Sequence, residues 1–148
     1  MSYSEKKEDA TTSVIKGYVE RESVRVLVTG SRNWGNCDFI EEKMKEITEP
    51  GSQMVLIEGG CPTGADRIAR LYATGAGWKV ETCKADWNNF GKAEGPIRNK
   101  KMVYECEPDH VLGFCIDNSK GTMGTIAMAK KRMKDFPGTI KSVECHHC

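Results

Sequence analysis

The sequence lacks the features that would assign it to a membrane or a secreted class. No run of about 18 apolar residues occurs among its 148 residues, so no segment is long enough to cross a membrane as a helix. Residues 1–9 are polar and charged, without the apolar stretch of a signal peptide. Both absences predict a cytoplasmic protein that has no membrane partner.

An excess of charge is also missing. The chain carries 22 Lys and Arg residues against 21 Asp and Glu residues, for a formal net charge of +1. Proteins that bind a phosphate backbone without sequence preference usually carry a clear positive charge. The composition therefore argues against nucleic acid as the main partner.

A disulfide framework is not expected, although there are seven cysteines. Their number is odd and they are scattered among predicted strands and helices, which favours reduced thiols. The last four residues, Cys145 to Cys148, are all potential metal ligands. Adjacent side chains in one short segment cannot surround an ion, so we predict no metal site and interpret residues 144–148 as a mobile tail. We also predict no cofactor.

The chain does contain a regular alternation of strands and helices. Short apolar segments predict strands, and segments with apolar residues three or four positions apart predict helices. We expect strands over 24–28, 54–57, 78–83, 111–116 and 139–143, and helices over 38–49, 65–75, 95–104 and 121–136. This order is typical of a Rossmann-like α/β domain, with a mostly parallel sheet of about five strands and helices on both faces. The domain should span residues 24–143, after a polar lead-in over 1–23.

Three loops that follow predicted strands are rich in glycine and hydroxyl-bearing residues: 29–32, 59–66 and 117–122. Ligands of open parallel sheets bind outside the carboxyl ends of the strands, where these loops should meet. Glycine lets a backbone approach a ligand closely, helix N-termini attract anions, and Arg32 can bind phosphate through two parallel hydrogen bonds. Together the loops predict a site for a phosphate group.

The loop over 59–66 is not a standard nucleotide-binding motif. It lacks the lysine of a Walker motif and does not match GxGxxG, so neither ATP hydrolysis nor standard dinucleotide binding follows. Asp66 either places a favourable charge at a helix start or accepts hydrogen bonds from a ribose. We interpret Cys61 as a loop residue, because no histidine is expected beside it.

Other side chains are expected near the same edge. Arg98 and Asn99 come early in a predicted helix and can reach the loops, unless they belong to a solvated basic face. Trp34 and Trp87 either stack on a base or pack at the base of a loop.

Five motifs together resemble the YspA-like branch of the SLOG superfamily, whose relatives include the LOG phosphoribohydrolases and the DNA-processing protein DprA. They are residues 28–32 with Trp34, and residues 59–66, 85–87, 95–99 and 120–122. The resemblance covers residues 24–143 and implies a Rossmann-like fold, a nucleotide-type ligand and self-association into a homo-oligomer. The branch has no generally assigned activity.

The resemblance to the LOG enzymes is incomplete. Those enzymes cleave a nucleoside monophosphate with an arginine and a glutamate. Arg98 matches the arginine and is the candidate catalytic residue, but Thr125 stands where the glutamate is expected. A threonine cannot accept a proton at neutral pH, and Asp66 or Glu58 would have to replace the missing carboxylate. The sequence leaves enzyme activity open.

We therefore expect a protein that senses or sequesters a nucleotide-derived molecule, of NAD, ADP-ribose or cyclic-nucleotide type, as SLOG relatives do in bacterial and phage defence. One alternative is a LOG-like phosphoribohydrolase. Another is a single-stranded nucleic-acid binder, because residues 121–125 are similar to a loop of DprA. The predicted ligand-binding residues are Thr29, Gly30, Ser31, Arg32, Trp34, Gly59, Gly60, Cys61, Thr63, Gly64, Ala65, Asp66, Trp87, Arg98, Asn99, Ser119, Gly121 and Thr122.

Overall fold

The computed structural model describes residues 14–15, 18–19, 23–86, 91 and 94–147. Its strands are β2 (Val14–Ile15), β3 (Tyr18–Val19), β4 (Ser23–Gly30), β5 (Gln53–Glu58), β6 (Lys79–Thr82), β7 (His110–Cys115) and β8 (Ser142–His147). Its helices are α1 (Cys37–Ile47), α2 (Gly64–Gly75), α4 (Glu94–Tyr104) and α5 (Lys120–Asp135).

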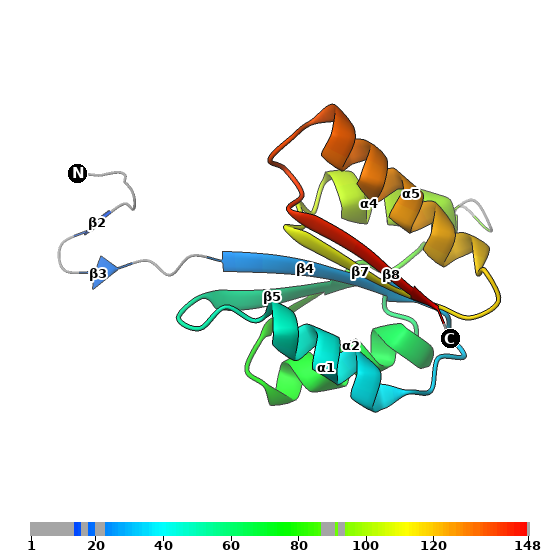
Figure 1. The fold of residues 1–148 in the computed structure, drawn as a ribbon, viewed down its shortest axis with the longest axis horizontal. Coiled ribbons are helices and arrows are strands. Elements are labelled where there is room, and N and C mark those ends of the chain that lie inside the picture. The colour runs from blue at the N-terminus through cyan, green and yellow to red at the C-terminus, as the bar shows by residue number, and fades with distance from the viewer. Residues whose placement is uncertain (1–13, 16–17, 20–22, 87–90, 92–93, 148) are drawn as a thin grey trace.

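Five strands form one sheet in the order β6-β5-β4-β7-β8, and every neighbouring pair is parallel (Figure 1). The predicted Rossmann-like α/β class is therefore confirmed. The strands form because short β-branched and apolar segments alternate with helical ones, and parallel neighbours need a helix as crossover. The short β2 and β3 pair with each other antiparallel. The rest of the predicted lead-in before Ser23 lies outside the described residues.

Helices cover both faces of the sheet (Figure 1). On one face α1 and α2 pack against Val24, Val26 and Val28 of β4. On the other face α4 and α5 pack against Leu27 of the same strand and Ile57 of β5. Successive residues of a strand point to opposite faces, so one apolar strand supplies both cores. None of the helices in the described residues is long and apolar enough to pass through a bilayer.

The strand order places a crevice at one edge of the sheet. From β4 the chain passes through β5 to β6 on one side, whereas β7 and β8 lie on the other side of β4. The segments that leave β4 and β7 therefore diverge at the carboxyl ends of these neighbouring strands. In open α/β sheets this divergence is the usual place for a ligand.

The last strand lies further along the chain than predicted. It begins at Ser142 rather than at residue 139 and continues through His147, paired with β7. Residues 144–147 therefore belong to the sheet and do not form a separate tail. The cause is packing: Cys145 contacts the core under α5, and the ring of His146 stacks on Phe114. Cys148 lies outside the described residues.

Candidate functional site

A pocket of about 370 Å³ lies at the divergence of β4 and β7 and is here called the central pocket. It brings together the three predicted loops and α4, which are far apart in sequence. Its lining consists of Thr29, Gly30, Ser31, Arg32, Asn33, Gly59, Cys61, Asp66, Arg98, Asn99, Met102, Ile116, Asp117, Ser119, Gly121 and Thr122.

A second pocket, of about 550 Å³, lies over the loops that follow β5 and β6 and is here called the lateral pocket. It is lined by Arg32, Gly59, Gly60, Cys61, Pro62, Thr63, Lys84, Ala85 and Arg98. Arg32, Gly59, Cys61 and Arg98 line both pockets, so the two cavities meet at these four residues. The predicted Gly64 and Ala65 line neither pocket.

Two motif glycines hold the loops against each other. A Cβ on Gly30 would lie 2.5 Å from the Ala65 Cβ and 2.6 Å from the Phe114 carbonyl oxygen. A Cβ on Gly64, whose φ is +74°, would lie 2.3 Å from the Ser31 carbonyl oxygen. At these positions the absence of a side chain permits contact between protein segments. Gly30 also lines the central pocket, and its close approach to a ligand stays a prediction.

Ser31 connects three walls of the central pocket. Its amide donates to the Phe114 carbonyl at 2.8 Å, and its hydroxyl accepts from the Ile116 amide at 2.8 Å. Its carbonyl accepts from the Ala65 amide, at the start of α2, at 3.2 Å. The loops after β4 and β7 and the N-terminus of α2 are thereby fixed to one another.

The two helix N-termini at the central pocket lack side-chain caps. Thr63 precedes α2 and Ser119 precedes α5, and neither side chain accepts a hydrogen bond from a backbone amide of its helix, although the Ser119 hydroxyl accepts one from the Thr122 hydroxyl at 3.4 Å. The first amides of a helix need partners outside the helix, and within the described part of the chain the Ala65 amide alone has one, in the hydrogen bond to Ser31. Uncapped amides and the helix dipole make such ends favourable for an anion.

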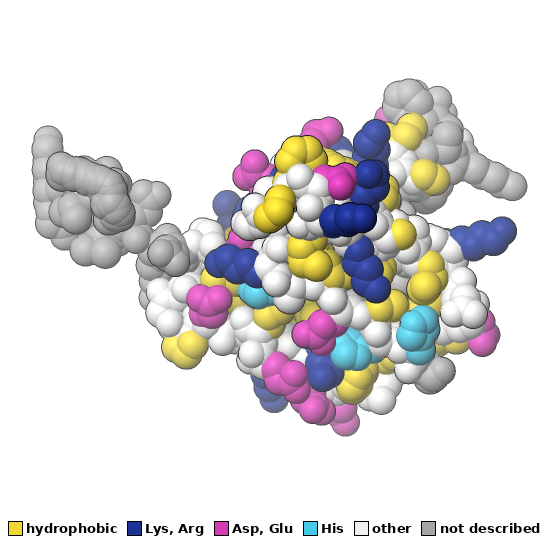
Figure 2. Space-filling view, turned by 45° about the horizontal axis from the view of Figure 1, so that its top comes forward, with side chains coloured by type: hydrophobic (Ala, Val, Ile, Leu, Met, Phe, Trp, Pro, Cys, Tyr) yellow, Lys and Arg dark blue, Asp and Glu magenta, His cyan; other side chains and the backbone are white. Residues whose placement is uncertain are grey.

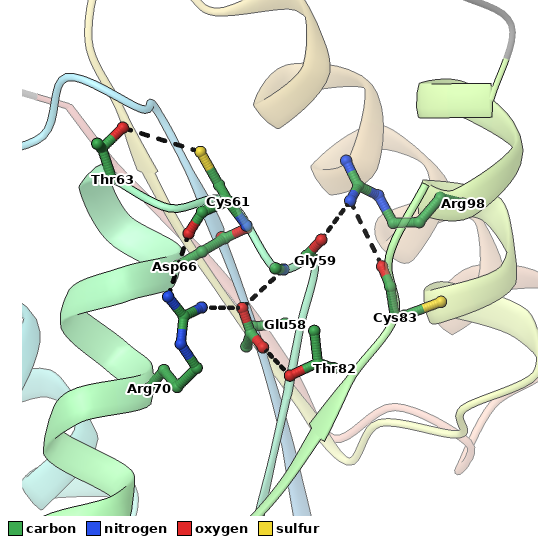
Figure 3. A network of polar contacts seen from close by, with 10 residues as sticks. Glu58, Gly59, Cys61, Thr63, Asp66, Arg70, Thr82, Cys83 and Arg98 are labelled. Carbon is green, nitrogen blue, oxygen red and sulfur yellow. Dashed lines mark hydrogen bonds and ion pairs between the residues drawn. The ribbon is translucent and has the colours of Figure 1, made fainter. Parts of the chain in front are cut away.

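Arg98 extends from α4 across the loop that follows β5 (Figure 3). Its Nη1 donates to the Gly59 carbonyl at 2.7 Å and to the Cys83 carbonyl at 3.4 Å, and its Nε donates to Asn99 Oδ1 at 2.7 Å. It forms no ion pair with a carboxylate of the described residues. The guanidinium is thus positioned by neutral groups, and no carboxylate holds it in a bidentate pair that would exclude a ligand phosphate.

Asp66 lies on the other side of Gly59 from Arg98 and is 8% exposed (Figure 3). Its Oδ2 accepts a hydrogen bond from the Cys61 amide at 3.3 Å. Burial raises the pKa of Asp66 from 3.8 to about 6, against the opposing effects of the Cys61 amide and the Arg98 charge. Arg98 therefore does not neutralise Asp66 as a salt-bridge partner would.

Glu58, the other carboxylate that we considered for catalysis, lies outside both pockets and is fully buried. It accepts from Arg70 Nη1 at 2.8 Å, from the Gly60 amide at 2.7 Å and from the Thr82 hydroxyl. These partners satisfy both carboxylate oxygens, so Glu58 stabilises the loop after β5. Thr125 is buried as well, and its hydroxyl donates to the Gly121 carbonyl at 2.9 Å.

Trp34 lines neither pocket, so of its two predicted roles the structure favours packing at the base of a loop over stacking on a base. It is 4% exposed and its ring packs against Phe39 and Phe114 in the core, while its Nε1 donates to the Asn36 carbonyl at 3.0 Å. The hydrophobic gain from burying an indole explains this position. Trp87 lies outside the described residues.

Several lining residues were missed by sequence reasoning. Asn33, Met102, Ile116 and Asp117 line the central pocket, and Lys84 lines the lateral pocket. Asp117 had a detectable signal, because it opens the third predicted loop. Met102 and Ile116 had none, since their apolar side chains are indistinguishable from core residues in the sequence.

Comparisons with known proteins agree with this architecture. Residues 24–90, which include β4, β5 and the loops after them, match the model of the YspA, cpYpsA-related SLOG family. The chain is also 35% identical over 113 residues to the Gene 61 protein of Mycobacterium phage D29, an alignment that covers 72% of this chain and 89% of that relative. The chain therefore belongs to the YspA, cpYpsA-related SLOG family.

Proposed function

We propose that the protein binds a phosphate-bearing nucleotide, or a small molecule derived from one, in the central pocket. The observation that carries the proposal is the pairing state of two cations. Arg98 is held by carbonyl groups, and Arg32 is exposed, and neither forms an ion pair within the described part of the chain. Two unpaired guanidinium groups beside two uncapped helix N-termini favour a bound phosphate.

The remaining lining supports a nucleoside attached to that phosphate. The carboxylates of Asp66 and Asp117 accept hydrogen bonds and suit the hydroxyls of a ribose. Met102 and Ile116 add an apolar surface suited to a base. Family membership supports a nucleotide-related ligand in general, and it agrees with these residues.

The role that we propose is to sense or sequester the ligand. A relative encoded by a phage supports a place in phage defence or anti-defence. The homo-oligomer that the family resemblance implies stays a prediction, and light scattering of the purified protein tests it.

Isothermal titration with AMP, ADP, ADP-ribose, NAD and cyclic nucleotides tests the binding proposal. At least one should bind, and Arg98→Ala should weaken it by about tenfold to a hundredfold, because a charge-assisted contact is lost. Arg67→Ala is the matched control, since Arg67 is exposed on α2 and lines neither pocket. The proposal fails if no compound binds at millimolar concentration, or if both variants have the same effect.

Cleavage of an N-glycosidic bond is a second candidate, favoured by one observation. Asp66 and Arg98 face each other across Gly59, and the pKa of Asp66 is about 6, so the carboxyl group exchanges protons near neutral pH. Chromatography of nucleotides after incubation would detect released base, which Asp66→Asn and Arg98→Ala should both abolish. Intact nucleotide after prolonged incubation would contradict cleavage and leave ligand binding as the proposed function.

We do not propose a single-stranded nucleic-acid binder. The face in Figure 2 carries acidic as well as basic side chains, interspersed with hydrophobic ones. Trp34, an aromatic residue that we considered for base stacking, is in the core. Proteins that bind single-stranded nucleic acid combine a basic groove with exposed aromatic side chains.

A further inference from the structure

Asn99 follows Arg98 on α4, and its side chain helps to decide how that arginine is held. Asn99 is half-buried and lines the central pocket. We propose, on the basis of the nucleotide site above, that Asn99 is a positioning residue. It fixes Arg98 through a neutral group and thereby makes the site selective for anionic over neutral ligands. An aspartate at this position would hold Arg98 equally well but would remove the selectivity.

The first support is the distribution of the Arg98 hydrogen bonds. Its Nη1 donates to the carbonyls of Gly59 and Cys83, and its Nε donates to Asn99 Oδ1 at 2.7 Å. The other terminal nitrogen, Nη2, points away from both carbonyls, and no described residue accepts a hydrogen bond from it (Figure 3). Two of the five N–H donors of a guanidinium are on this atom. They are available to an oxygen of a ligand.

The second support is the orientation of the Asn99 amide. Because Nε of Arg98 can only donate, the atom of Asn99 that faces it is the carbonyl oxygen Oδ1. The amide nitrogen Nδ2 therefore points away from the guanidinium, and it carries donors and no acceptor. The Asn99 side chain thus uses its acceptor to hold Arg98 and does not repel an anion that enters the central pocket.

The third support is the effect of a carboxylate on another arginine of the same molecule. Glu81 accepts from Nη1 and Nη2 of Arg25, with one hydrogen bond to each carboxylate oxygen. Nε and Nη2 of a planar guanidinium form an edge with two donors of the same kind. The amide oxygen of Asn99 accepts from Nε and leaves Nη2, whereas a carboxylate at residue 99 would place a negative charge beside both donors. The neutrality of Asn99, and not its hydrogen bond alone, keeps Arg98 available to an anion.

Titration of AMP, ADP and adenosine against the whole chain tests the selectivity, because the nucleotides differ from adenosine only in their phosphates. The wild type should prefer the nucleotides over adenosine by at least about thirtyfold. Asn99→Asp retains an oxygen for Nε, and it should reduce this preference to less than about threefold. Asn36→Asp is the matched control, since Asn36 is the exposed N-cap of α1 and lines neither pocket. It should leave the preference unchanged.

A double-mutant cycle with AMP tests whether Asn99 acts through Arg98. Asn99→Ala should weaken AMP about fivefold in the wild type, because Arg98 loses the acceptor for its Nε. In an Arg98→Ala background the same substitution should change the affinity less than about twofold. A residue that only stabilises the fold would have the same effect in both backgrounds. A thermal melt of each variant checks that its fold is intact.

The possible failures of the two proposals are distinct. An unchanged preference in Asn99→Asp, or equal effects of Asn99→Ala in the two backgrounds, would overturn the role of Asn99 and leave the nucleotide site intact. Absence of binding for AMP and ADP, together with NAD, ADP-ribose and cyclic nucleotides, would overturn the nucleotide site itself.

Discussion

Arg25, near the amino end of β4, and Arg98, at the carboxyl edge of the sheet, are both half-buried arginines that donate to backbone carbonyl groups. Arg25 also donates to both carboxylate oxygens of Glu81, at 3.0 and 2.6 Å. That pairing raises the pKa of Arg25 and lowers the pKa of Glu81, as expected of a bidentate ion pair. Arg98 does not form such a pair with the nearby Asp66, because its donors bond to the carbonyls of Gly59 and Cys83 and to the Asn99 side chain.

The difference separates arginines that stabilise the fold from arginines that remain available to a ligand. A bidentate pair uses the donors of the guanidinium and cancels its charge. A guanidinium held by carbonyl groups is equally well positioned, but no carboxylate binds it in a bidentate pair. Four substitutions test whether pairing, rather than position in the sheet, decides the role of each arginine.

Arg70 gives the strongest test, because it lies at the carboxyl edge but is paired with the buried Glu58 at 2.8 Å. Glu58→Gln should lower the free energy of unfolding by about 3 kcal/mol, since it breaks a buried ion pair. The loss should not be larger, because Arg70 is 30% exposed and can be hydrated. Urea denaturation measures it. Glu46→Gln, in an exposed pair with Lys43, should cost less than about 0.5 kcal/mol, and equal losses would contradict the argument.

Asp66→Asn should raise the free energy of unfolding, whereas Glu58→Gln should lower it. Because the pKa of Asp66 rises from 3.8 to about 6 on folding, the folded state binds more protons than the unfolded state in this window. Stability therefore falls as the pH rises through the window, and at pH 8 the charged carboxylate costs about 2 to 3 kcal/mol. The variant should be more stable than the wild type by that amount at pH 8.

Urea denaturation of Asp66→Asn at pH 8 and near pH 3 checks this prediction. The gain should vanish near pH 3, where Asp66 is largely protonated in both states. Asp38→Asn, at an exposed position of α1, controls for the change in net charge. A gain of equal size at both pH values would show that Asp66 is not a buried charge.

Arg25→Ala should lower the free energy of unfolding by about 2 kcal/mol, because the hydrogen bonds to Glu81 and to the Cys106 carbonyl are lost in a partly exposed setting. Nucleotide affinity should not change, since Arg25 lines neither pocket. Chemical denaturation and titration of the same variant measure the two quantities. A loss of nucleotide affinity without a loss of stability would show that Arg25 serves the ligand and not the fold.

Arg32→Ala should have the smallest effect on the fold and a clear effect on binding. Arg32 is exposed and lines both pockets, so stability should change by less than about 0.5 kcal/mol. Nucleotide affinity should fall about tenfold with the loss of one charge-assisted contact. Titration, with Arg67→Ala as the control, gives the answer. Unchanged affinity would remove Arg32 from the site.

The fold of the predicted domain could be read from the sequence because hydrophobic periodicity and turn residues agree over residues 24–143. The short β2 and β3 in the lead-in were not predicted, and β8 shows the limit of the signal within the domain. Cys145, His146 and His147 are not a typical strand sequence, and they become one through pairing with β7 and contact with the core. Tertiary packing decides such a segment, and local pattern does not reveal it.

The site was predictable in its loops and less so in its side chains. Motif glycines identified the loops, although Gly30 and Gly64 serve protein contacts. The sequence allowed two roles for Trp34, and only the packing of Phe39 and Phe114 decides between them. Likewise Glu58 and Asp66 are both acidic residues beside the loop after β5, and the sequence does not distinguish their roles. In the structure Glu58 accepts hydrogen bonds from Arg70 and Thr82, whereas Asp66 lines the central pocket.

The hydrogen bonds of Ser31 have a further consequence for selectivity. Three walls of the central pocket are fixed to one another before any ligand arrives, so binding need not order them. The conformational entropy lost on binding is then confined to exposed side chains such as Arg32 and Lys84. Walls that do not rearrange cannot adapt to a ligand of different shape. The pocket should therefore discriminate among related nucleotides by steric exclusion, and a compound too large for it should be rejected rather than accommodated.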